Sequence, residues 1–385
     1  MNEFVFVVKV SKFCNLRCAY CYEHRELHVK DRMSFDTLRR LFAGIDAFGD
    51  YLTAQGIPPK FSFVWHGGEP LLISQDYYRE MTALQGDHIR RYSYRNSVQT
   101  NLYGINKATL DYVLKSQWEL GISIDFASGI RRNVGGRDSN AAVIVAAEKL
   151  HQTGATFGVL SVLGAHNRDS LPQAYGWVAA HADGWRILPV FDGGPEADVA
   201  KLQLPAEEIV SVFTDIFRRR SEARRHIPVA PLDDYLKSAT LRLVGERLEA
   251  DVTGPLLDNI FVVNVNGDLY TRPFAYDASH CLGNIGEAGM PELLGRGPYR
   301  TCQRAIARRK TQNCLACEYR GYCDSSPMHE HGSVVKNGEG ERCAVPRRTI
   351  AAIEIELASA GVDRAVIAGW AREWLAGQSD GARAM

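Results

Sequence analysis

The sequence lacks the features that mark nucleic-acid-binding, secreted or membrane proteins. It carries no net charge, because 45 basic residues balance 45 acidic ones, so bulk attraction to nucleic acid or to an anionic membrane is disfavoured. It has no apolar run as long as a membrane span, and no internal repeat or low-complexity segment. Its first residues lack the basic segment of a secretory signal. We therefore expect a cytoplasmic protein with no nucleic-acid or membrane partner.

The size and the nine cysteines are the next constraints. A chain of 385 residues with 45% hydrophobic composition exceeds what one hydrophobic core usually serves, so more than one domain is expected. Thiols stay reduced in the cytoplasm, where clustered cysteines bind metal more often than they form disulfides. The clustered cysteines are therefore expected to be metal ligands.

Strand-like and helix-like patterns alternate over the first half of the chain. Helices are predicted after Ser34, from Asn106, and over 141–150 and 173–181. Alternation of this kind predicts parallel βα units, as a partial barrel or as an open doubly wound sheet. Chemistry gathers at the carboxyl ends of the strands in either fold. The six predicted strands are 4–10, 61–65, 92–100, 119–125, 156–163 and 185–190.

The second half of the chain has a different character. Two connecting helices are predicted over 205–247, a β-hairpin around Asn266-Gly267, and a helical tail over 347–376. Cysteine-rich loops lie between the hairpin and the tail. We predict four parts: a barrel, a helical linker, a cysteine-rich domain and a helical tail, at 1–195, 196–255, 256–345 and 346–385.

Three cysteines directly follow the first predicted strand. Cys14, Cys18 and Cys21 form a CxxxCxxC run. Three thiolates can hold three irons of a four-iron cluster and leave the fourth iron open for chemistry. A structural zinc site is the alternative, with His24 or His28 as its fourth ligand.

A glycine-rich turn follows the second predicted strand. Gly67 and Gly68 have no Cβ, so a ligand can approach the backbone closely. Glu69 can accept hydrogen bonds from an ammonium group. An ordinary tight turn would explain the two glycines alone. The cysteine run, this turn and the Ser123/Asp125 segment all lie at carboxyl ends of predicted strands, which indicates one shared site.

These motifs resemble those of the radical S-adenosylmethionine (SAM) superfamily. The resemblance covers residues 4–190 and rests on the cysteine run, with Tyr20 before its last cysteine, and on Gly67-Gly68-Glu69-Pro70. It implies an α/β fold built on a partial (β/α)6 TIM-like barrel. It also implies a [4Fe-4S] cluster on the three cysteines, whose open iron binds the amine and carboxylate of SAM. An electron, supplied by a donor such as flavodoxin or ferredoxin, then splits SAM into methionine and a 5′-deoxyadenosyl radical that takes hydrogen from the substrate.

The resemblance also implies further SAM contacts. Tyr20, Gly67, Gly68 and Glu69 lie in the shared motifs, and Ser123, Asp125 and Arg132 resemble a segment that meets SAM in peptide-modifying members. Members of the sulfatase-maturase type usually continue with Gly-Pro and a His-Asp pair. This chain instead has FASGIRRN over 126–133, so Arg131 and Arg137 remain alternatives to Arg132.

A second group of cysteines lies near the carboxyl end. Cys314, Cys317, Cys323 and Cys343 resemble the auxiliary iron–sulfur domain (SPASM or twitch type) of peptide-modifying members, which implies one auxiliary [4Fe-4S] cluster. A zinc ribbon has similar spacing and is the alternative. Pro327 replaces a further cysteine of that pattern. Cys281 and Cys302 alone leave a second auxiliary cluster two ligands short, and either can be a plain buried thiol.

The resemblance gives a first hypothesis for function and two rivals. The first is that the enzyme forms a crosslink, of cyclophane or thioether type, in a ribosomally made precursor peptide. The second is a radical SAM dehydrogenase, either of the sulfatase-maturase type or acting on a small molecule. The third, from another class, is a non-catalytic zinc or iron–sulfur module. The residues reveal neither the substrate nor a general base.

Overall fold

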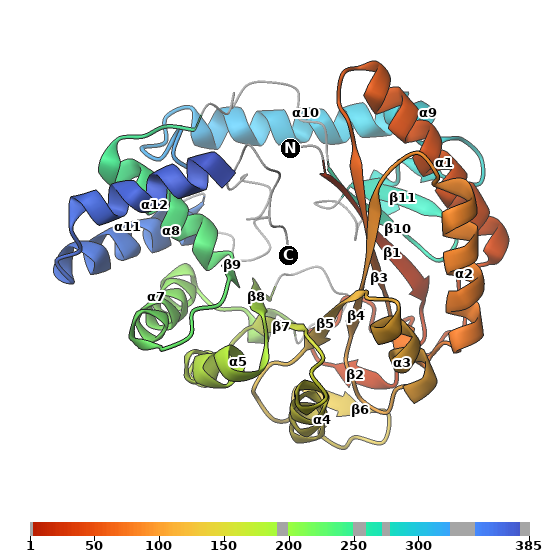
Figure 1. The fold of residues 1–385 in the computed structure, drawn as a ribbon, viewed down its shortest axis with the longest axis horizontal. Helices are drawn as coiled ribbons and strands as arrows, with labels where there is room; N and C mark the ends of the chain where they lie inside the picture. The colour runs from red at the N-terminus through yellow and green to blue at the C-terminus, as the bar shows by residue number, and fades with distance from the viewer. Residues whose placement is uncertain (1–2, 191–198, 249–258, 272–277, 324–342, 378–385) are drawn as a thin grey trace. The chain divides into compact units, whose positions relative to one another are not determined.

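A computed structural model describes residues 3–190, 199–248, 259–271, 278–323 and 343–377 (Figure 1). The chain forms two compact units, each built from several segments. The first unit contains Met1–Ser123, Arg131–Phe157 and Leu256–Arg304. The second contains Ile124–Ile130, Gly158–Pro255 and Ala305–Met385. The four parts predicted from the sequence, with their boundaries, stay a prediction.

Parallel strands form the sheet of the first unit. β1 pairs with β3, β3 with β4, and β4 with β5, each in parallel register. Helices separate these strands along the chain, as the alternating pattern predicted. The elements are β1 (Glu3–Ser11), β2 (Leu16–Cys18), α1 (Phe35–Ala54), β3 (Lys60–Gly67), η1 (Pro70–Leu72), α2 (Gln75–His88), β4 (Tyr94–Thr100), α3 (Lys107–Lys115), β5 (Glu119–Ser123), β6 (Arg131–Asn133) and α4 (Asn140–Gln152).

One face of this sheet is aromatic and packs against α1. Phe4 of β1 meets Phe48 edge to face, with ring centroids 5.4 Å apart. Phe63 of β3 meets Phe42 in the same way at 5.9 Å. Side chains alternate between faces of a strand, so these residues point to the helix side. The helix begins where the sequence predicts, because the Ser34 hydroxyl accepts a hydrogen bond from the N–H of Thr37.

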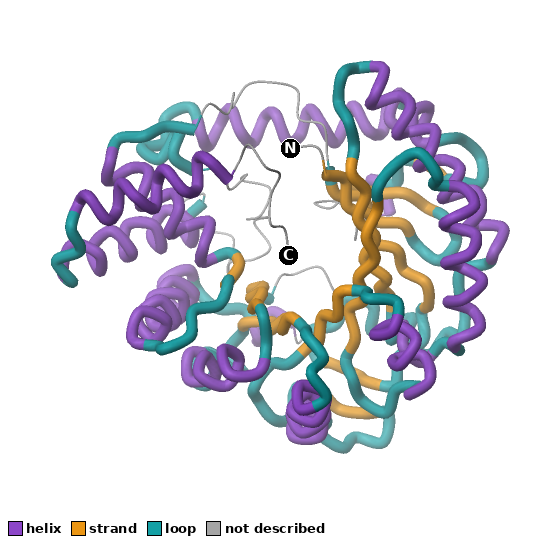
Figure 2. Tube along the Cα trace, viewed as in Figure 1, coloured by secondary structure: helices purple, strands orange, loops and turns teal. Residues whose placement is uncertain are grey.

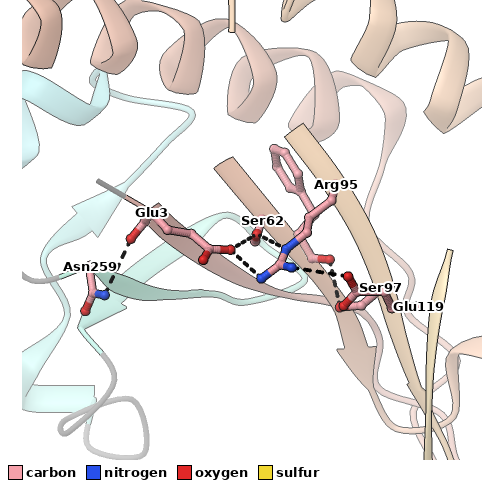
Figure 3. Close-up of polar contacts among 7 residues, drawn as sticks. Glu3, Ser62, Arg95, Ser97, Glu119 and Asn259 are labelled. Carbon is pink, nitrogen blue, oxygen red and sulfur yellow. Dashed lines mark hydrogen bonds and ion pairs between the residues drawn. The ribbon is translucent and has the colours of Figure 1, made fainter. Parts of the chain in front are cut away.

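The opposite face of the same sheet is polar (Figure 3). Arg95 of β4 donates to Glu3 of β1 at 2.6 Å and to Glu119 of β5 at 3.3 Å. Its Nε also donates to the Ser62 hydroxyl of β3 at 2.8 Å. One guanidinium thus ties four neighbouring strands together. This face of the sheet therefore carries charged side chains across β1, β3, β4 and β5.

The predicted hairpin extends this sheet. β10 (Ile260–Val263) and β11 (Asp268–Thr271) pair in antiparallel register around the Asn266-Gly267 turn, as predicted. No sequence pattern predicted that β10 also pairs in parallel with β1, from Val5 opposite Ile260 to Val8 opposite Val263. Phe261 stacks on Phe6 at 5.5 Å and fixes this register. The remaining elements here are η4 (Ala278–His280), β12 (Gly283–Asn284), α9 (Met290–Gly295) and α10 (Gly297–Cys314).

The second unit combines three short parallel strands with helices (Figure 2). β8 pairs in parallel with β7 and with β9. Helices α7 and α8 are the two connecting helices that the sequence predicts, and α11 and α12 form the predicted tail. The elements are β7 (Gly158–Leu163), η2 (Pro172–Ala174), α5 (Tyr175–His181), β8 (Gly184–Pro189), α6 (Val199–Leu202), α7 (Ala206–Glu222), β9 (Val229–Ala230), α8 (Leu232–Val244), α11 (Ala344–Ser359) and α12 (Arg364–Gly377).

All six strands predicted in the first half are present, as β1, β3, β4, β5, β7 and β8. The helix α2 was not predicted, because its sequence is too polar to show a clear apolar stripe. Among the helices of the described residues, none is both long and apolar enough to cross a bilayer.

Candidate active site

The first cysteine run forms a loop packed around two leucines. Cys14, Leu16 and Leu27 are buried together, and Cys18 and Cys21 pack against them. Backbone hydrogen bonds fold the loop on itself, from the Cys14 N–H to the Leu27 carbonyl and from the Cys21 N–H to the Cys18 carbonyl, both at 3.0 Å. The three thiols therefore belong to one small, largely dry structure.

Burial makes the free thiolates of this loop unfavourable. It is the largest cause that raises the pKa of both Cys14 and Cys21 to about 12, and the charge of neighbouring cysteines contributes to this shift. A thiol in such surroundings is inert unless a metal binds it, because coordination deprotonates it outright. The loop therefore favours thiolates only when a bound metal centre balances their negative charge.

The glycines of the turn after β3 contact the cysteine loop directly. The Gly68 N–H donates to the Ser11 carbonyl and the Glu69 N–H to the Phe13 carbonyl, both at 2.8 Å. A Cβ on Gly67 would stand 2.1 Å from the Ser11 oxygen, and one on Gly68 would stand 2.3 Å from the Phe13 oxygen. The glycines are required by this backbone-to-backbone contact, whereas the sequence suggested only room for a ligand. The turn therefore holds the segment that leads into Cys14.

Glu69 holds the ends of β3 and β4 together. Its side chain is 1% exposed. One carboxylate oxygen accepts hydrogen bonds from the Leu71 N–H at 2.9 Å and the Thr100 hydroxyl at 2.7 Å, and the other accepts from the Asn101 N–H at 2.7 Å. The Asn101 amide in turn lies 3.6 Å from the Cys14 sulfur. The observed role of Glu69 is therefore to position the turn, and its predicted contact with SAM stays a prediction.

The buried carboxyl of Glu69 should make stability depend on pH. Burial raises its pKa from 4.5 to about 7, more than its three hydrogen bonds lower it. The pKa of Glu69 is higher in the folded state than in the unfolded state. Its protonated carboxyl therefore stabilises the fold fully below pH 4.5, and this contribution is lost as the pH rises through 7. The free energy of unfolding should fall by about 3 kcal/mol over this pH range. Urea unfolding of the iron-free protein at pH 5 and pH 8 measures it.

Glu69→Gln is the comparison for that experiment. Glutamine cannot titrate, so the variant should lose the part of the pH dependence that lies between pH 5 and 8. Histidines titrate in the same range in both proteins and cancel in the difference. Equal pH dependence in the two proteins would contradict the assignment.

The arginines predicted near the site differ in position. β6 pairs in antiparallel register with β2, so that Cys18 lies opposite Arg131 and Arg17 opposite Arg132. Arg131 is 2% exposed, and its charge lowers the pKa of both Cys14 and Glu69, after stronger effects of burial. Arg132 is exposed. The pairing of β2 with β6 therefore places the buried Arg131, and not the exposed Arg132, opposite a cysteine of the loop. No local sequence pattern predicts this pairing.

The other predicted contacts are placed as follows. Tyr20 is half-buried in the cysteine loop. Ser123, at the end of β5, accepts a hydrogen bond from the Gln99 amide at 2.9 Å. Asp125 is fully buried in the second unit, where it accepts from the Val162 N–H at 2.8 Å. Arg137 is exposed. Contacts of these residues with a cofactor stay predictions.

The described distal cysteines lie on a short loop and at two helix ends of the second unit. Cys314 ends α10, and the Cys317 N–H donates to its carbonyl at 3.2 Å. The Cys323 N–H donates to the Tyr319 carbonyl at 3.0 Å. Cys343 precedes α11 as its N-cap residue. Pro327 lies outside the described residues. In the described part of the chain, no group of three or more histidine, cysteine, aspartate or glutamate side chains is arranged to hold a metal ion.

Arg242 fastens the distal loop to the helices of the second unit. Its guanidinium lies 4.9 Å from the Tyr319 ring, 2.6 Å from Glu354 and 3.6 Å from Glu318. Arg242→Met would leave the largely buried Glu354 carboxylate without this partner. We expect a loss of about 2 kcal/mol in the free energy of unfolding. The exposed pair of Arg218 and Glu356 joins α7 to α11, so Arg218→Met is the control and should cost at most about 1 kcal/mol.

Comparison with known proteins gives the class of this site. Residues 8–178 match the sequence profile of the Radical SAM superfamily. The chain is 23% identical over 369 residues to a serine-type anaerobic sulfatase-maturating enzyme of Bacteroides thetaiotaomicron, covering 87% of this chain and 85% of that one. It is 24% identical over 302 residues to a cysteine-type anaerobic sulfatase-maturating enzyme of Clostridium perfringens, covering 75% and 79%.

Solved structures share the fold. Native anSMEcpe with bound AdoMet and the Kp18Cys peptide matches with a TM-score of 0.72 at 18% identity, over 93% of this chain and 99% of that one. Streptococcus suis SuiB bound to precursor peptide SuiA matches with a TM-score of 0.57 at 14% identity, over 88% and 76%. The predicted α/β class and TIM-like arrangement of parallel strands are confirmed.

The fold and the cysteine loop together define an oxidoreductase-type enzyme with a radical SAM domain at residues 8–178. Residues 8–178 are similar to the Radical SAM superfamily, whose members use a four-iron, four-sulfur cluster and SAM. A non-catalytic metal-binding module is thereby set aside.

Proposed function

We propose that this enzyme cleaves SAM reductively and abstracts hydrogen from a ribosomally made precursor peptide, in which it forms a crosslink of cyclophane or thioether type. The observation that carries the proposal is the direct contact between its two most specific motifs. Backbone hydrogen bonds join Gly68 and Glu69 to the segment that enters the cysteine run. Contact between the glycine turn and the cysteine loop favours a catalytic site, because a purely structural zinc site does not need a second motif to hold it.

The donor chemistry of the cysteine run fits the cluster that the family uses, although its three thiols do not surround a common metal position in this structure. Cys14, Cys18 and Cys21 supply three thiolates, and Leu16 and Leu27 keep their surroundings apolar. When bound, cluster and SAM together supply the radical chemistry. Arg131, buried near the Cys14 thiol, offsets the negative charge of the thiolates. We propose Arg131, in place of the exposed Arg132, as the arginine of this site.

The remaining assignments follow the sequence. Tyr20, Gly67, Gly68, Glu69, Ser123 and Asp125 are proposed to border SAM, with Glu69 acting through the turn that it holds. Cys314, Cys317, Cys323 and Cys343 are proposed to hold one auxiliary cluster. A cellular electron donor such as flavodoxin or ferredoxin is proposed to supply the reducing electron.

The proposed function is tested first without any peptide. The protein is reconstituted anaerobically with iron and sulfide and reduced with dithionite in the presence of SAM, and 5′-deoxyadenosine is measured. Its absence would refute the enzyme reaction proposed here. Co-expression with a short peptide encoded beside the gene follows, and mass spectrometry should show loss of two hydrogens with fragments missing across the linked residues.

A second candidate is oxidation of a sulfatase residue to an aldehyde. The named relatives favour it, since serine-type and cysteine-type sulfatase-maturating enzymes match over three quarters or more of this chain. A hydrazide probe separates the two products, because it labels an aldehyde and leaves a crosslink untouched. Labelling of a co-expressed sulfatase would support the second candidate over the first.

A further inference from the structure

His66 is a half-buried histidine next to the cysteine loop that no motif explains. It is the last residue of β3 before Gly67, and it lies opposite Lys9 in the parallel pairing of β1 and β3. Its Nδ1 is buried and has no hydrogen-bond partner among the described residues. A buried polar atom is usually paired, so an unpaired one next to a reaction site indicates a missing ligand.

A buried ion pair borders His66. Lys9 lies 2.5 Å from Glu23, with the side chains only 10% and 12% exposed, and the Lys9 ammonium stands 5.1 Å from the centre of the Tyr22 ring. Glu23 follows Cys21 by two residues and so ties this pair to the cysteine loop. The pair also keeps the surroundings of His66 close to neutral, because one positive and one negative charge face it.

The electrostatics leave His66 uncharged at neutral pH. Burial lowers its pKa, Glu23 raises it and Lys9 lowers it. On the other side of β3 the neighbouring strand β4 offers Gln99, which carries no charge. A neutral imidazole has one ring nitrogen with a free lone pair, so it can accept a proton.

His66 lies at the carboxyl end of β3, where a side chain can contact substrate. It ends a strand whose next residues, Gly67 and Gly68, touch the segment leading into Cys14. It projects from the polar face of the sheet, as Ser62 does four residues earlier, and away from the aromatic face formed by Phe63 and Trp65. Substrates of parallel β/α folds bind at this end of the strands.

We propose that His66 is the general base of the reaction, and that the Lys9–Glu23 pair positions it. This inference rests on the proposed function. After a hydrogen atom has been removed from a substrate carbon, that carbon bonds to a second substrate atom X as the X–H bond breaks. The proton goes to the lone pair of His66, and the remaining electron goes to an oxidised iron–sulfur cluster, the one-electron acceptor. The substrate thus loses two hydrogens and two electrons in total.

His66→Gln tests this role in the reconstituted holoenzyme, and His226→Gln is its control. Glutamine keeps hydrogen-bonding capacity and cannot carry the proton, whereas His226 is exposed in the second unit. We expect 5′-deoxyadenosine formation to stay within about twofold of the unmodified enzyme while crosslinked peptide falls about 100-fold. The acid limb of the pH profile of product formation should also disappear. Unchanged product yield and pH profile in His66→Gln would overturn the proposal.

A second measurement needs no peptide. Diethyl pyrocarbonate acylates neutral imidazoles, and peptide mapping of the treated holoenzyme reports each histidine separately. His66 should be acylated in the holoenzyme, and adding SAM should slow its acylation. A His66 that stays unlabelled at every pH is sealed from substrate, which refutes its role. Absence of 5′-deoxyadenosine in the unmodified enzyme would instead refute the proposed function, and the labelling would still report on His66.

Discussion

Replacing Cys14, Cys18 or Cys21 singly with alanine is expected to abolish 5′-deoxyadenosine formation completely. Each substitution removes one of the three thiolates proposed to hold the cluster, and no other residue of the loop supplies sulfur. The iron content after anaerobic reconstitution should also fall, by the iron of one cluster per chain. The measurement is chromatographic detection of 5′-deoxyadenosine with SAM and dithionite.

Cysteines elsewhere provide the matched controls. Cys302 is buried in α10, and Cys302→Ala should leave SAM cleavage intact. Cys317→Ala should retain SAM cleavage while product formation is lost, if the distal cysteines hold an electron-accepting cluster. Equal loss of SAM cleavage in Cys317→Ala and Cys14→Ala would show instead that the distal centre is needed for folding.

Gly68→Ala is expected to be among the most damaging single changes outside the cysteines. The new Cβ would stand 2.3 Å from the Phe13 carbonyl oxygen and 2.4 Å from that of Lys12. Both atoms belong to the backbone that enters the cysteine run, so they can yield only if the loop moves. Overpacking typically costs about 1–3 kcal/mol, and contacts with backbone belong at the upper end. Urea unfolding measures the loss, and iron binding after reconstitution should fall as well.

Gly86→Ala is the control for this substitution. Gly86 lies in α2, where a Cβ would meet only the Tyr94 hydroxyl oxygen at 3.8 Å. Alanine is the better helix former, so this variant should gain up to about 1 kcal/mol. A Gly68→Ala protein as stable as the unmodified one, with full iron binding, would show that the turn does not support the loop.

The reason for the two glycines shows where reasoning from sequence alone fell short. The Gly-Gly pair predicted a close approach of a ligand to the backbone, and that contact stays a prediction. The neighbour proved to be the main chain of residues 11–13, which a sequence pattern cannot name because it lies more than fifty positions away. Glu69 is similar: the pattern marks a carboxylate, and only the fold shows that Leu71, Thr100 and Asn101 already occupy it.

The sequence by itself determined the α/β class, the six strands of the first half and the hairpin, because apolar periodicity and turn residues act over a few positions. It also indicated the radical SAM domain that residues 8–178 match, since the cysteine spacing and the Gly-Gly-Glu turn are local motifs. Only the tertiary structure decided that β10 joins β1, that β6 brings Arg131 to Cys18, and that His66 faces Lys9. These contacts depend on pairing between segments that are distant in the sequence. Side-chain packing across the strands sets the register of that pairing, so neither segment alone predicts it.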